Sequence, residues 1–85
     1  MRYVILIEEG RSNFSAYAPD VPGCVATGKS LDEIKQRMKE ALEFHFEGIL
    51  LDGEPVPQAT TRSASVDIKV AELRKRIQRP KRTVG

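Results

Sequence analysis

The sequence predicts an α+β domain built from a three-stranded antiparallel meander, one long helix, a fourth strand and a short C-terminal helix or tail. Three observations lead to this class. Apolar and polar residues alternate near the start of the chain, a helical spacing of three and four residues follows Ser30, and strict alternation returns over residues 64–70. A chain of 85 residues holds one domain with a thin core.

Three short strands are expected before the helix. Residues 2–8 are rich in β-branched and aromatic residues on both faces, which is typical of a central strand. Residues 14–18 alternate with period two and should form an antiparallel hairpin with the first strand. Residues 24–27 read as a third strand. Pro22-Gly23 before it fits the centre of a type II turn, because proline sets the first φ and glycine accepts a positive second φ.

The long helix carries signals at both ends. Ser30 and Glu33 predict a capping box, in which the serine oxygen accepts from the Glu33 N–H and the Glu33 carboxylate accepts from the N–H of Ser30. Gly53 follows Asp52 as a C-terminal cap, and the prolines after it prevent the helix from resuming. The stripe expected to face the sheet consists of Leu31, Ile34, Met38, Ala41, Leu42, His45 and Ile49.

The remaining elements depend on something to pack against. Residues 64–70 alternate apolar and polar side chains and predict a half-buried fourth strand. Val70, Leu73 and Ile77 would align on a helix of roughly eight residues that ends before Pro80, and a helix so short is expected to form only if it docks. One helix cannot cover both faces of such a sheet, so a homodimer or homotetramer is expected.

Charge divides unevenly along the chain. Residues 1–70 hold eight Lys and Arg against eleven Asp and Glu, a net −3, whereas residues 71–85 hold six against one, a net +5. This asymmetry predicts that the body binds a basic partner or that the tail binds nucleic acid; a solubilising, poorly ordered terminus is the structural alternative. The candidate nucleic-acid-binding residues are Arg74, Lys75, Arg76, Arg79, Lys81 and Arg82. The tail has no aromatic residue and is too short for a helix-turn-helix, so it supports only non-specific electrostatic contact.

The residue types that usually carry out catalysis do not form a recognisable catalytic combination in this sequence. Cys24 has no base beside it and is expected to be a buried small hydrophobe, while His45 is expected to pack on the core side of the helix. One cysteine and one histidine also exclude an internal disulfide and a nitrogen–sulfur zinc site within one chain. Glu8, Asp20 and Asp67 do not predict a metal-binding cluster. We therefore expect no enzymatic activity, no cofactor and no metal.

One stretch matches the spacing of a phosphate-binding loop. Gly23, Gly28, Lys29 and Ser30 stand at the required positions. Such a loop functions within a large parallel α/β sheet, which 85 residues cannot hold, so this match is interpreted as coincidental. The apolar run of residues 3–7 is too short for a signal peptide or a membrane span, and a cytoplasmic protein with no membrane contact is expected.

Four linked strings carry a family resemblance. They are residues 16–28 (AYAPDVPGCVATG), 30–34 (SLDEI), 40–48 (EALEFHFEG) and 52–57 (DGEPVP). In this order and spacing they resemble the HicB antitoxin family. The resemblance implies a partial ribonuclease H-like fold without nuclease activity, with residues 1–70 as the HicB-like domain and residues 71–85 as a basic C-terminal helix or tail.

The resemblance also implies a partner. HicB-type antitoxins bind HicA, a small basic mRNA-cleaving toxin, and cover its active site, which agrees with the acidic body described above. Many of them repress their own operon through a C-terminal DNA-binding domain, whereas only fifteen residues follow Val70 here. Operator DNA is therefore expected only through the basic tail or an oligomer. The alternatives are an orphan regulator that binds nucleic acid and, less favoured, a residual nuclease using Glu8 or Asp20.

Overall fold

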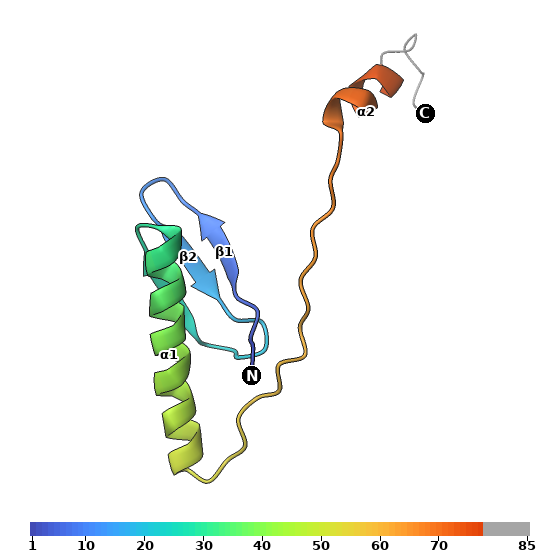
Figure 1. Cartoon of the computed structure of the whole chain (residues 1–85). Coiled ribbons are helices and arrows are strands. Elements are labelled where there is room, and N and C mark those ends of the chain that lie inside the picture. The colour runs from blue at the N-terminus through green and yellow to red at the C-terminus, as the bar shows by residue number, and fades with distance from the viewer. Residues whose placement is uncertain (78–85) are drawn as a thin grey trace, which may run out of the picture.

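The computed structural model describes residues 1–77, in which a long helix packs on one face of a three-stranded sheet (Figure 1). The strands β1 (Leu6–Glu9), β2 (Phe14–Tyr17) and β3 (Val25–Gly28) form an antiparallel meander in the order β1-β2-β3. Helix α1 (Leu31–Leu51) follows, and helix α2 (Val70–Ile77) lies at the far end of an extended segment. The predicted α+β class, the meander, the long helix and the short C-terminal helix are confirmed.

The strand register places two aligned rows of side chains on opposite faces of the sheet. The row that faces α1 consists of Ile7, Ala16 and Ala26. The adjacent row consists of Leu6, Tyr17 and Val25. Because successive side chains of a strand alternate, this second row points away from α1. All three of its members are exposed, so the structure leaves one face of the sheet uncovered within the described residues.

The turn into β3 forms as predicted. The N–H of Cys24 donates to the carbonyl of Val21 at 3.2 Å, which closes a turn across Pro22 and Gly23. Gly23 has φ +84, the positive value that the third position of a type II turn requires. At the other end of β3, Gly28 lies against the first turn of α1, where an added Cβ would be 3.0 Å from the backbone nitrogen of Ile34.

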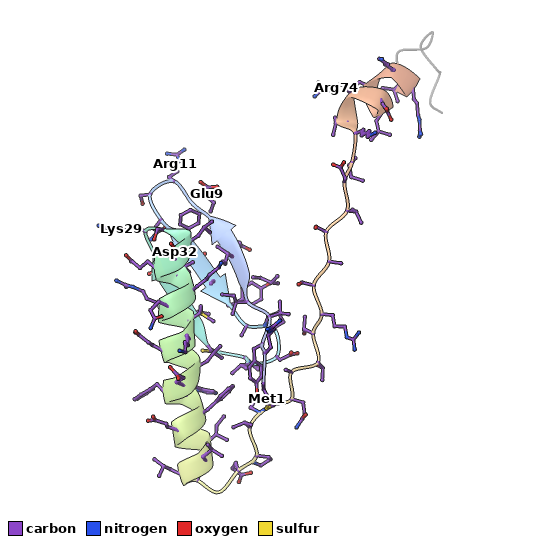
Figure 2. The ribbon with its side chains drawn as sticks, in the orientation of Figure 1. Met1, Glu9, Arg11, Lys29, Asp32 and Arg74 are labelled. Atoms are coloured by element: carbon purple, nitrogen blue, oxygen red, sulfur yellow. The ribbon has the colours of Figure 1, made fainter. Side chains whose placement is uncertain are left out.

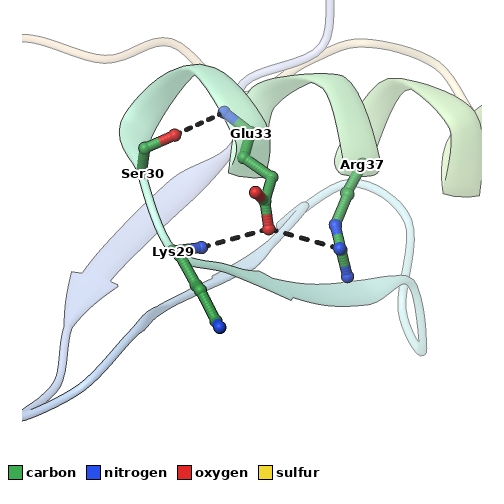
Figure 3. Close-up of polar contacts among 4 residues, drawn as sticks. All are labelled: Lys29, Ser30, Glu33 and Arg37. Atoms are coloured by element: carbon green, nitrogen blue, oxygen red, sulfur yellow. Dashed lines mark hydrogen bonds and ion pairs between the residues drawn. The ribbon is translucent and has the colours of Figure 1, made fainter.

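Helix α1 begins at a serine cap (Figure 3). Ser30 Oγ accepts from the N–H of Glu33 at 3.1 Å, as predicted. The Glu33 carboxylate, however, accepts from the N–H of Lys29 at 3.2 Å and not from that of Ser30. Lys29 follows the last residue of β3, and its N–H has no backbone acceptor in the described chain, so the carboxylate satisfies it. The same carboxylate oxygen pairs with Arg37, one turn further on, at 3.2 Å.

The helix ends in a Schellman motif around Gly53. The N–H of Gly53 donates to the Leu50 carbonyl at 3.0 Å, and the N–H of Glu54 donates to the Ile49 carbonyl at 3.0 Å. Gly53 has φ +73, the left-handed conformation that glycine adopts without steric cost. The predicted glycine cap is confirmed.

The core lies between α1 and the inward face of the sheet. Its buried members are Ala16, Ala18, Val21, Cys24, Ile34, Met38 and Leu42. With 21 residues α1 is about 31 Å long, whereas a four-residue strand spans about 13 Å. The helix therefore runs past the end of the sheet, as Figure 1 shows. His45 lies on this overhanging part and is exposed, so the prediction that it packs in the core is wrong.

Two predicted strands differ from the structure by more than one residue at an end. The first was expected from residue 2, but β1 begins at Leu6 because its partner β2 ends at Tyr17, directly opposite. The fourth strand, expected over residues 64–70, does not form: residues 62–69 run as an exposed extended segment, and Val70 already belongs to α2. A strand needs a neighbour for its backbone hydrogen bonds, and within residues 1–77 neither segment has one.

Helix α2 forms without docking, against expectation. It packs on no other element of the described chain. Its residues Ala71, Glu72, Leu73, Arg74, Lys75 and Arg76 all have favourable helix propensity, which accounts for a helix in this position. Its apolar residues Val70, Leu73 and Ile77 remain exposed.

Candidate partner-binding site

The segment that follows α1 is fastened to the body at two points. Tyr3 Oη donates to the carbonyl of Pro57 at 2.6 Å, and the Tyr3 ring lies against Phe46 with 5.1 Å between ring centroids. Further along, one carboxylate in the loop between β2 and β3, that of Asp20, holds two consecutive threonines. These contacts of Asp20 hold residues 54–61 against the end of the domain where the β2–β3 loop lies.

Asp20 makes four hydrogen bonds, which we call the Asp20 clamp. Asp20 Oδ2 accepts from the N–H groups of Thr60 and Thr61, both at 2.9 Å. Asp20 Oδ1 accepts from the hydroxyl groups of the same residues, at 3.0 Å from Thr60 and 2.7 Å from Thr61. Hydrogen bonds from the backbone and side chain of Thr61 favour the charged form and lower the pKa of Asp20. Both oxygens are thus engaged in holding the chain, which accounts for Asp20 as a structural residue.

The clamp predicts an acid-sensitive contribution to stability. Because the folded pKa of Asp20 is below its ordinary value of 3.8, the contribution is present above that pH and is lost as pH falls through the folded pKa. We expect the difference in unfolding free energy between the wild type and Asp20→Asn, measured with urea at pH 7, to shrink steadily below about pH 4. Asp67→Asn, which removes an exposed carboxyl from the extended segment, serves as the control. A pH-independent difference for Asp20→Asn would contradict the clamp.

A groove runs between the N-terminal segment and the flank of α1. It has a volume of about 610 Å³. Its apolar lining consists of Met1, Tyr3, Ile5, Met38, Leu42, Phe46, Leu50 and Val56. Arg2, Lys35, Lys39 and Glu43 supply its charged lining. We call this feature the edge groove, because it borders residues 1–5, which lead into β1.

The face of α1 that points away from the core presents a second surface, which begins within the sheet-covered part and continues along the overhang, and which we call the outer stripe. It consists of Glu40, Phe44, Glu47 and Leu51. These positions are spaced by four, three and four residues and therefore lie on one face of the helix. Phe44 and Leu51 are 80% and 87% exposed, so two large apolar residues stand in solvent beside two carboxylates. Apolar residues in such a setting are typical of a protein-binding surface.

The predicted nucleic-acid-binding residues are only partly within the described chain. Arg74, Lys75 and Arg76 lie on α2 and are exposed, and Figure 2 shows Arg74 well away from the sheet. Arg79, Lys81 and Arg82 lie outside the described residues. No acidic side chain pairs with the three described basic residues in residues 1–77. Their role in binding nucleic acid stays a prediction.

The candidate catalytic residues are placed apart. Cys24 is buried, as predicted, and burial raises the pKa of its thiol. His45 is on α1, and Glu8 is on the outward face of β1. Within residues 1–77 no three His, Cys, Asp or Glu side chains converge to hold a metal ion. The phosphate-loop match is likewise unsupported, because its residues Val25–Gly28 form β3 and cannot wrap around a phosphate.

Sequence reasoning missed the outer stripe. The apolar stripe that predicts the core face of the helix does not include Phe44 or Leu51, which lie on the opposite face. A signal was present, since two large apolar residues seven positions apart on a charged face have no place in the core. Of the two helices in the described chain, neither combines the length and the apolar character that a bilayer span needs.

Comparison with known proteins places these features in a family. The model of a family described as HicB_like antitoxin of bacterial toxin-antitoxin system matches residues 3–75. A 14.9 kDa protein from the rep-hol intergenic region of Haemophilus phage HP1 is 42% identical over 59 residues, which cover 69% of this chain and 44% of that protein. A UPF0150 protein of Archaeoglobus fulgidus is 40% identical over 48 residues, or 55% of this chain and 70% of that protein. This chain thus spans less than half the length of the phage protein and most of the archaeal one.

A solved structure agrees in both fold and sequence. One chain of the structure titled HicA3 and HicB3 toxin-antitoxin complex is similar to this chain with a TM-score of 0.61 and 30% identity, covering 71% of this chain and 70% of that one. The meander with one long helix and the match over residues 3–75 lead to the same conclusion. The chain belongs to the HicB-like antitoxin family of bacterial toxin–antitoxin systems.

Proposed function

We propose that this protein binds a HicA-type mRNA-cleaving toxin and neutralises it by covering the toxin's active site through the outer stripe. The single observation that carries this proposal is the pairing of exposed apolar and acidic side chains on the face of α1 that points away from the core. Membership of an antitoxin family, and the similarity to a chain of a toxin–antitoxin complex, support a protein partner.

The chemistry of the outer stripe suits a basic partner. Glu40 and Glu47 carry like charge on one helix face, and no Lys or Arg within residues 1–77 pairs with either. A basic toxin would supply the missing counter-charge and would be steered towards this face during encounter. Phe44 and Leu51 would lose their exposed apolar surface in the contact, and buried aromatic anchors commonly dominate binding energy.

The test needs a HicA-type toxin, and the proposal predicts that the gene next to this one encodes it. Purified toxin is assayed for RNA cleavage with increasing amounts of the full chain, and stoichiometric inhibition is expected. Glu40→Lys/Glu47→Lys should weaken inhibition at least about 30-fold, because two attractive charges become repulsive, and Phe44→Ala should weaken it by about 10-fold or more. Raised salt should weaken the wild-type complex but affect the charge-reversed variant far less.

A matched control is available at the other end of the molecule. Glu8→Lys/Glu9→Lys makes the same change of net charge at the tip of the hairpin, where Figure 2 shows Glu9 beside Arg11. This control should inhibit as well as the wild type. Equal weakening by both double variants would reduce the effect to net charge and remove the outer stripe from the proposal. Failure of the wild-type chain to bind the toxin would overturn the function itself.

A second candidate function rests on α2. Its exposed Arg74, Lys75 and Arg76 are free of described acidic partners, which favours an orphan regulator that binds nucleic acid as an oligomer. Charge reversal of these three residues should abolish salt-sensitive binding to duplex DNA in a fluorescence-anisotropy titration. If the wild type and this variant bind DNA equally, the candidate is dismissed.

A further inference from the structure

Two segments of this chain are extended and carry apolar side chains, but they have no strand partner within the described residues. Residues 2–5 lead into β1 beyond the end of β2, and β1 itself is an open edge of the sheet. Residues 62–69, which we call the arm, leave the body after Thr61 and are exposed throughout. No N–H group of residues 62–68 donates to a backbone carbonyl in the described part of the chain. Unpaired edges and arms of this kind are templates for strand pairing.

The arm and the β1 edge are complementary in length and chemistry. Residues 2–9 and 62–69 are both eight residues long and would extend over about 26 Å each. In the arm, Val66 and Ile68 lie on one face, 83% and 58% exposed, while Ser65 and Asp67 lie on the other. A strand added beside β1 would set the apolar face of the arm over the edge groove and leave the polar face in water.

The occupant of the β1 edge is best supplied by a second copy of this chain. The Asp20 clamp fixes Thr60 and Thr61, and Val56 of the same chain already lines the edge groove. Beyond the clamp the arm runs free of its own sheet (Figure 1). Each copy therefore carries one donor arm and one acceptor edge that do not meet, and two copies related by a two-fold axis satisfy both at once. For the outward row of the sheet, the described chain offers no second unpaired segment that would match it in the same way.

The geometry points to an arm-exchanged homodimer, in which residues 62–69 of each copy form a fourth strand beside β1 of the other copy. This arrangement accounts for both missing strands, because residues 2–5 and the arm would gain a neighbour in the same event. It also covers the apolar lining of the edge groove, including Leu42 and Phe46. The inference is independent of any toxin and leaves the outer stripe accessible.

Light scattering after size-exclusion chromatography of the full chain tests the proposal. The wild type is expected to be a dimer. Val66→Asp should weaken the dimer by roughly 100-fold or more, because it replaces an apolar side chain with a carboxylate that must lose water against the apolar lining of the edge groove. Ser65→Asp adds the same charge at the adjacent position on the polar face and should leave the dimer intact. Both sites are exposed in the single chain, so both variants should keep the wild-type far-UV circular dichroism.

Isotope-filtered NMR of a mixture of labelled and unlabelled chains identifies the pairing. Nuclear Overhauser effects between the Ile68 and Leu42 methyl groups are expected between different chains. A monomeric wild type would overturn the proposal, and so would a dimer that Val66→Asp leaves intact, since the outward row of the sheet would then be the interface. Nuclear Overhauser effects confined to a single chain would show that the arm pairs with β1 of its own chain, which would also overturn the arm-exchanged dimer. No toxin is present, so failure here is distinct from failure of the proposed function.

Discussion

Met38→Ala is expected to unfold a large fraction of the protein at 37 °C. The Met38 side chain is fully buried between α1 and the sheet, at 0% exposure. Replacing it with alanine removes buried apolar surface and leaves a cavity, which costs about 2–5 kcal/mol. A domain of this size has a total stability near the low end of about 5–15 kcal/mol, so the loss is a large share of the whole. The urea midpoint, followed by circular dichroism at 222 nm, measures it.

Leu51→Ala is the matched control for the core substitution. It removes a large apolar side chain from the same helix, but Leu51 is 87% exposed, so its midpoint should stay close to that of the wild type. In the toxin inhibition assay the ranking should reverse at temperatures where both variants are folded, because Leu51 belongs to the outer stripe and Met38 does not. A Met38→Ala midpoint equal to the wild-type value would mean that α1 does not pack on the sheet as described.

Gly28→Val should be similarly damaging, for a reason that involves no lost contact. A Cβ at this position would lie 3.0 Å from the nitrogen and 3.2 Å from the Cα of Ile34, and backbone atoms cannot rotate away as a side chain can. The valine would push β3 from the first turn of α1, and overpacking of this kind costs roughly 1–3 kcal/mol or more. Gly28→Ala should lie between the wild type and the valine variant. Urea unfolding monitored by circular dichroism gives the order.

A substitution at Gly48 provides a control that is expected to change stability in the opposite direction. It lies within α1, and nothing stands within 4 Å of a Cβ added there. Gly48→Ala should therefore raise the unfolding free energy by about 1 kcal/mol, because alanine restricts the unfolded chain and favours the helix. A Gly28→Val variant as stable as the wild type would refute the close approach of β3 and α1.

The features that were predictable from the sequence are those that a few neighbouring residues determine. The serine cap and the glycine cap define both ends of α1, and Pro22 with Gly23 defines the type II turn. Each involves hydrogen bonds between residues no more than five positions apart, so local chemistry decides it. The buried state of Ile34, Met38 and Leu42 also followed from helical spacing alone.

The features that were not predictable depend on how far one element reaches relative to another. His45 has the angular position of a core residue, yet α1 is longer than the strands it covers, and no periodicity within the helix reports the length of the sheet. The alternation over residues 64–70 correctly describes a chain suited to pairing, but it cannot say where the neighbouring edge is. The outer stripe was not predictable for a related reason, because its proposed role depends on the surface of a binding partner, which helical periodicity does not describe.

The overhang of α1 divides one helix into two regions under separate constraints. Positions facing the sheet, such as Ile34 and Met38, are restricted by the volume of the core and tolerate little change. Past the end of the sheet, exposed positions such as Phe44 and Glu47 do not pack in the core. Substitutions there should change the free energy of unfolding very little. Under the proposed function, an antitoxin built in this way would diverge in partner choice while its scaffold stays the same. Related pairs within one cell could then avoid cross-reaction by substitutions on a single exposed helix face.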